Sequence, residues 1–150
     1  MSAVRWNAPT GAIALTAATA RTVLQLIAAS NHRATLKELS VSFDGVSNTA
    51  TPVVVRLLRQ TTAGTGGTSL TLTKGNPGDD ETIQTTANHS LTAEPTAGDL
   101  IETYYIHPQG GRDWQAPFAE PTTIPGGTRL GIEITAPAGV NVRVVAKGEE

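Results

Sequence analysis

The 150-residue sequence contains no cysteine, and it has few aromatic and few charged residues. The absence of cysteine excludes disulfides and thiolate metal sites. A domain of this length buries about 70% of the surface that its unfolded chain exposes, so it needs no such cross-links to fold. The lack of cysteine leaves the compartment open, because a β domain of this size is stable without disulfides in reducing and oxidising settings alike.

Strong charge and long apolar runs are also missing. The formal net charge of −2 provides no basic field for phosphate backbones, so we expect no nucleic-acid partner. No run approaches the ~20 apolar residues of a membrane-spanning helix, so we expect no membrane partner. Residues 1–6 lack the apolar region of a secretory signal. We therefore expect a protein that is made in a cytoplasm and used without export.

Threonine and glycine are abundant where charge is scarce. Threonine suits a half-exposed strand, while glycine and proline mark turns. A surface of threonine, serine and glutamine is weakly solvated, which favours a protein that packs against copies of itself or a partner. A base-composition bias of the genome would produce the same pattern.

The last residues carry the clearest structural pattern. Apolar residues alternate with polar or small ones over 130–134, a Pro-Ala-Gly turn follows at 137–139, and the alternation resumes over 140–144. Two runs of period two around a turn predict a β-hairpin with one buried face. The C-terminus is therefore expected to belong to a sheet.

Other apolar stretches predict further strands. Residues 17–29 have helical propensity, but Thr22, Val23 and Ile27 are β-branched, so we predict a strand there. Residues 53–59 are apolar on both faces, which predicts core on one side and a subunit contact on the other. The segment 82–98 predicts long ordered loops with one or two short strands, and the remaining strands are expected at 13–15, 39–43, 70–72, 100–106 and 114–118.

About eight strands with loops of uneven length predict an all-β fold, a jelly-roll-like β-sandwich. An immunoglobulin-like sandwich is the alternative, although it usually needs only about 100 residues. We expect residues 12–150 to form this single domain. Residues 1–11 are predicted to be an extended N-terminal arm, and deletion of residues 2–8 is expected to leave the β domain folded. Arg5, Trp6 and Asn7 of this arm are predicted to bind a partner, because arginine and tryptophan are enriched at binding hot spots.

No motif in the sequence predicts catalysis. His32, His89 and His107 lie in different segments, without the spacing of metal ligands. The acidic cluster at 79–81 is either a solvated loop or a calcium site without EF-hand spacing. The Gly/Thr segment 64–69 lacks the end of a phosphate-binding loop, so a flexible loop is predicted. We expect no enzyme activity, no cofactor and no bound transition metal.

Several segments carry a family resemblance. They are LSVSFDGV at 39–46, PVVVRLL at 52–58, EP at 94–95, IPGGTRLGI at 124–132 and VNVRV at 140–144. Over most of residues 15–147 the chain resembles small virion proteins of tailed bacteriophages. The resemblance implies a jelly-roll decoration or cement protein that stabilises the phage head, often as a homotrimer. Its partners would be copies of itself and the major capsid protein, and its place the capsid surface.

Two other functions remain open at this point. Tail-fibre and receptor-binding domains share these strand-and-turn patterns, so a carbohydrate- or receptor-binding domain of a phage tail or adhesin is the main alternative. Such a domain predicts exposed aromatic side chains, and Trp114 and Tyr105 are the candidates. A jelly-roll enzyme such as a cupin or a lyase would need clustered histidines and carboxylates, which the sequence barely supplies.

Overall fold

The computed structural model describes residues 3–45, 51–117 and 120–150, and none of these residues is helical. No helix able to cross a membrane is therefore present among them. The strands are β1 (Arg5–Pro9), β2 (Ile13–Leu15), β3 (Ala20–Ile27), β4 (Ala34–Phe43), β5 (Val53–Gln60), β6 (Thr68–Leu70), β7 (Thr73–Lys74), β8 (Thr86–His89), β9 (Ala97–Ile106), β10 (Gly111–Gln115), β11 (Thr122–Ile124), β12 (Arg129–Thr135) and β13 (Val140–Glu149).

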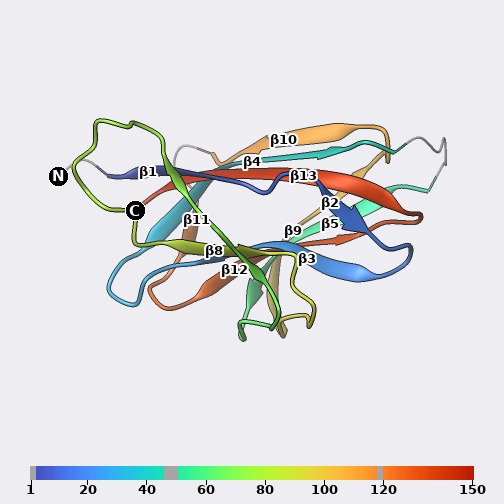
Figure 1. The fold of residues 1–150 in the computed structure, drawn as a ribbon, viewed down its shortest axis with the longest axis horizontal. Coiled ribbons are helices and arrows are strands. Elements are labelled where there is room, and N and C mark those ends of the chain that lie inside the picture. The colour runs from blue at the N-terminus through green and yellow to red at the C-terminus, as the bar shows by residue number, and fades with distance from the viewer. Residues whose placement is uncertain (1–2, 46–50, 118–119) are drawn as a thin grey trace.

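These strands form two antiparallel sheets packed as a sandwich (Figure 1). One sheet has the order β10-β4-β13-β1-β7, with β11 also paired to β4 and β2 to β13. The other has the order β6-β8-β3-β12-β5-β9. The all-β sandwich predicted from the sequence is confirmed.

The strand order is that of a jelly roll. Its eight principal strands are β1, β3, β4, β5, β9, β10, β12 and β13. The first pairs with the last, the second with the seventh, the third with the sixth and the fourth with the fifth. This nested pairing is what results when a long antiparallel ribbon folds over into two facing sheets. The short strands β6, β7 and β8 all lie in the long connection between β5 and β9.

The predicted C-terminal hairpin is wrong, although both of its strands exist. β12 pairs with β3 and β5, whereas β13 pairs with β4, β1 and β2 in the opposite sheet. The turn at 137–139 therefore crosses the sandwich. Alternation of apolar side chains reports which face is buried, and both strands bury one face in the same core, but it does not report the partner strand.

Other predicted strands agree with the structure more closely. Residues 17–29 contain β3 and no helix, and 82–98 contain the short strand β8 and the start of β9. The strand expected at 114–118 is displaced, because β10 ends at Gln115. Phe118 lies outside the described residues.

The core lies between the sheets and consists almost entirely of aliphatic side chains. Every second residue of each principal inner strand is buried, as in β12, where Leu130, Ile132 and Ile134 have no exposed surface. Trp6 is the largest side chain in this core. Trp6 on β1 lies opposite Gly148 on β13. Its ring fills the core near the two ends of the chain, which lie close together (Figure 1).

The predicted N-terminal arm is wrong for the residues that the structure describes. β1 pairs with β13 along its whole length, from Arg5 opposite Glu149 to Pro9 opposite Val145, and it also pairs with β7. Trp6 and Ala8 point into the core with 0% exposure. The domain therefore includes β1, and a deletion of residues 2–8 would remove Trp6 and Ala8 from the core.

Candidate functional site

The three predicted partner-binding residues lie on one strand but face different surroundings. Arg5 is exposed, Asn7 is partly exposed, and Trp6 between them is fully buried. Adjacent residues of a strand point to opposite faces, so Trp6 cannot share a surface with its neighbours. The prediction that Trp6 contacts a partner is wrong for this fold. The indole nitrogen of Trp6 has no hydrogen-bond partner among the described residues.

A surface hollow of about 330 Å³ lies beside Arg5 and Asn7. Two ion pairs cross it, Lys37 with Glu149 and Lys147 with Glu38, each with an N–O distance of 2.8 Å. These side chains are 30–46% exposed, and exposed ion pairs contribute little to stability. Most of the charges that line this hollow are therefore paired with each other, and Arg5 is the additional cation in its lining.

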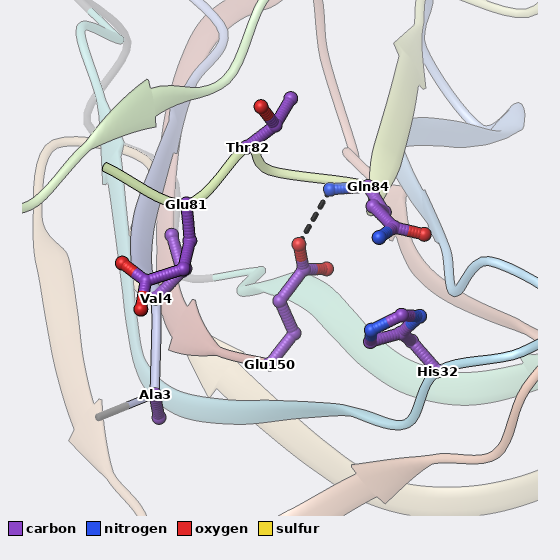
Figure 2. Close-up of a pocket in the computed structure, with 7 residues that line it drawn as sticks. All are labelled: Ala3, Val4, His32, Glu81, Thr82, Gln84 and Glu150. Atoms are coloured by element: carbon purple, nitrogen blue, oxygen red, sulfur yellow. Dashed lines mark hydrogen bonds between the residues drawn. The ribbon is translucent and has the colours of Figure 1, made fainter. Parts of the chain in front are cut away.

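A second hollow, of about 630 Å³, is lined by residues near both ends of the chain, among them Val4 and Glu150 (Figure 2). The carboxylate of Glu150 accepts hydrogen bonds from the backbone N–H groups of Gln84 at 2.5 Å and Thr85 at 2.8 Å, and from the Thr85 hydroxyl. The backbone of Glu150 pairs with Val4. Figure 2 shows the Glu150 carboxylate directed at Gln84, so it ties the 75–85 connection to the sheet rather than facing a ligand.

The candidate metal ligands are not brought together. His32 borders the hollow of about 630 Å³. His89 forms a hydrogen bond with the Ser90 hydroxyl, and His107 accepts one from the backbone N–H of Gln109. Within the described parts of the chain no group of three or more histidines and carboxylates converges.

The acidic loop at 79–81 follows a turn over 76–79, in which the backbone N–H of Asp79 donates to the backbone oxygen of Asn76. Asp79 accepts a hydrogen bond from the Asn76 side chain at 2.7 Å, and its backbone oxygen accepts one from Lys74. Asp79 is thus held by a neighbouring amide. Whether calcium binds at this loop stays open.

The Gly/Thr segment 64–69 is largely exposed, but backbone hydrogen bonds between Thr65 and residues 92–93 hold it in place. Gly64 and Gly66 have φ of +67°, a conformation that favours glycine, and Thr65 bridges to Ala93. These turns hold the segment against the connection that precedes β9. The sequence missed this because alternating glycine and threonine resembles a flexible linker, while the pairing partner lies far along the chain.

Beneath this segment lies a buried polar network. Gln25 stands between two core residues of β3, so it points to the outer face of its sheet, yet it is 0% exposed. Its amide donates to Gln60 at 2.7 Å, and Gln60 donates to the Thr22 hydroxyl at 2.9 Å. The Thr22 backbone N–H donates to Glu94 at 2.8 Å. The network joins the connection that contains Glu94 to the outer face of the sheet.

The open surface lies along β9, at the edge of the same six-stranded sheet. Leu100 is 52% exposed and Tyr105 is 70% exposed, the two exposed large apolar side chains of the described chain. Burial pattern and sheet order both place β9 at the edge of its sheet. Period-two alternation predicted this strand from the sequence, but residues 100–106 are apolar on both faces, so the pattern did not reveal which side is open.

Tyr104 and Arg112 connect the edges of the two sheets. Tyr104 on β9 is 7% exposed, and the guanidinium of Arg112 on β10 lies 4.3 Å from the centre of its ring. Burial, followed by the nearby Glu102 carboxylate, raises the pKa of Tyr104 to about 12, while Arg112 opposes this shift. The Tyr104 hydroxyl has no hydrogen-bond partner in the described chain.

Comparison with known protein families, with curated proteins and with solved structures gives no match for this chain.

Proposed function

We propose that this chain is a structural virion protein, a decoration or cement protein that binds and stabilises a phage head through surface contacts. Its fold is a jelly roll, the fold that the resemblance over residues 15–147 implies. The observation that carries the proposal is the exposed edge along β9, where Leu100 and Tyr105 leave apolar area open to solvent. Exposed apolar surface of this kind marks contact sites for other proteins.

Self-association and the major capsid protein are the proposed contacts. The homotrimer was predicted from the two apolar faces of residues 53–59. Leu58 on the outer face is only 1% exposed within a single chain, so it is unavailable for a subunit contact. The proposal therefore places self-association on β9 rather than on β5. A closed trimer needs two different surfaces on each chain, so a two-fold contact between β9 strands gives a dimer and does not by itself give the predicted homotrimer. Light scattering, compared with the 15.6 kDa of one chain, distinguishes the dimer from the trimer.

Antibody labelling of virions tests this function. Purified protein raises the antibody, and particles from lysates of the source are imaged by electron microscopy after gold labelling. We expect label distributed over the heads. Label on the tails would replace the proposal with the receptor-binding alternative, and particles without label would overturn a virion role altogether.

A specific observation favours the second candidate, a carbohydrate- or receptor-binding domain. Tyr105 exposes 70% of its surface, and sugars stack on exposed aromatic faces. Trp114, the other candidate, is half-buried against the core and offers less of its ring. Glycan-array binding that is lost in Tyr105→Ala and retained in Trp114→Phe would support this function over the first.

A further inference from the structure

β9 lies at the edge of its sheet, and its pairing with β5 is regular over 102–106 and shifts register around Leu58. It pairs with β5 on one side and is the last strand of its sheet on the other, so within the described chain its outer row of backbone groups has no partner strand. It is ten residues long, and its first seven residues are exposed or only partly buried. Long exposed edges with apolar side chains are templates for pairing with a further strand.

We propose that a second copy of this chain occupies the edge, with the two β9 strands antiparallel about a two-fold axis at Thr103. This deepens the self-association proposed above and rests on it. An isologous pair is the commonest closed contact between identical chains. It would join two six-stranded sheets into one continuous sheet and leave the opposite edges at β6 outermost.

The register follows from side-chain alternation. Residues directly opposed in an antiparallel pair lie on the same face, so the axis must pass through a residue rather than between two. An axis at Glu102 would oppose two carboxylates, which destabilises a pair. An axis at Thr103 opposes two exposed threonines and sets Glu102 opposite Tyr104. These residues lie in the part of β9 whose pairing with β5 is regular, 102–106.

Charge complementarity favours a second copy over another partner. Glu102 and Arg112 form no ion pair within the described residues of one chain. Arg112 lies over the ring of Tyr104, and the proposed register sets Glu102 of the second copy opposite that ring. The Glu102 carboxylate of one copy therefore meets the Arg112 guanidinium of the other, and the two-fold symmetry produces two such contacts. β9 carries acidic residues but no basic one, so β10 supplies the complement.

A single engineered thiol tests the contact, because the natural chain has no cysteine. In Thr103→Cys the two thiols would meet on the axis, within the separation that a disulfide spans. Ser69→Cys is the matched control, since Ser69 is exposed on β6 at the opposite edge of the same sheet. Under mild oxidation at micromolar concentration we expect Thr103→Cys to form a covalent dimer at least 10-fold faster than Ser69→Cys. Equal rates would overturn the proposed edge contact.

A charge exchange tests the register independently. Glu102→Arg should weaken the self-association measured by analytical ultracentrifugation at least 10-fold, because two guanidinium groups then face each other. Adding Arg112→Glu to that variant should restore association to within a few-fold of the natural chain. Circular dichroism confirms that these exposed substitutions leave the fold intact. Association that Glu102→Arg leaves unchanged would contradict this register.

Failure of this contact is distinguishable from failure of the proposed function. Oligomers that form without the Thr103→Cys cross-link, on a protein that still labels phage heads, would overturn the edge contact alone. A cross-linked dimer on a protein that labels no virion would overturn the virion role and leave the edge contact standing.

Discussion

At the scale of single residues, Trp6 has the largest structural consequence. It lies opposite Gly148, where an added Cβ would stand only 2.4 Å from the indole ring, so the glycine and the tryptophan fit each other. Together they close the end of the core at which the termini meet. Loss of the ring would leave a cavity that the surrounding strands cannot fill.

Trp6→Ala is therefore expected to lower the free energy of unfolding by about 3–5 kcal/mol. Arg5→Ala is the matched control, because Arg5 lies on the same strand with an exposed side chain, and it should change stability by less than about 0.5 kcal/mol. Urea denaturation monitored by far-UV circular dichroism, a signal that reports the backbone, measures both changes in the free energy of unfolding. If Trp6→Ala were as stable as Arg5→Ala, residues 1–11 would be an arm after all.

Tyr104 links stability to pH. The pKa of Tyr104 is raised to about 12 in the folded protein, above the value of about 10 for an unfolded tyrosine. The folded state thus holds its proton where the unfolded state has released it, so stability is full below pH 10 and is lost as pH rises towards 12. Tyr104→Phe should flatten this loss and leave stability at pH 7 undiminished, since it removes a buried hydroxyl without a partner.

Denaturant unfolding at a series of pH values between 8 and 12 checks this expectation. The informative quantity is the difference between the two proteins at each pH, because other groups titrate in both. A difference that stays constant across the series would show that Tyr104 has no raised pKa.

At the scale of elements, the sequence predicts strands better than it predicts their partners. Alternation at 130–134 and 140–144 identified both strands and their buried faces, yet the two belong to opposite sheets. Alternation is a local property of the strand, while the sheet to which it belongs is set by packing over the whole chain. The same alternation exists in β1, where asparagine and proline composition suggested an arm and the burial of Trp6 was missed.

The candidate surface was less accessible to sequence reasoning than the fold. Tyr105 was noted as a possible exposed aromatic, and the structure places it at the open edge. The pairing of Arg112 with the ring of Tyr104 depends on the approach of two strands in different sheets, which no local pattern encodes. The polar network of Gln25 was likewise missed, because a single glutamine in an apolar strand does not reveal what covers it.

The outer face of the six-stranded sheet yields an element-scale prediction. An added Cβ at Gly131 would lie 2.3 Å from the side-chain amide of Gln60, which bonds to Gln25. Gly131→Ala should therefore displace the buried network and destabilise the fold by about 1–3 kcal/mol. Gly139→Ala in the turn is the control, since its nearest neighbour is 3.8 Å away, and it should be tolerated. Thermal unfolding compares the two, and equal melting temperatures would mean that the network yields without cost.

At the scale of the whole molecule, the proposed function is binding to other proteins, and the described residues include no group of three or more candidate metal ligands. We expect elemental analysis of the dialysed protein to find no stoichiometric zinc, iron, manganese or copper. A tightly bound metal would require a cluster of ligands that the described residues do not form. Its detection would favour the cupin alternative. A rise in melting temperature with calcium would assign binding to the loop at 79–81, because a ligand held only by the native state stabilises it.

Hydrogen exchange at two protein concentrations tests the central claim, that copies of this chain associate through β9. Within Ala97–Ile106, the backbone amides that are not directed at β5 should exchange readily in dilute protein, where the outer edge of the strand faces solvent. At high concentration we expect their protection to rise, while amides of the central strand Val140–Glu149 stay unchanged. Protection of β9 that does not depend on concentration, or a rise confined to another surface, would contradict the account.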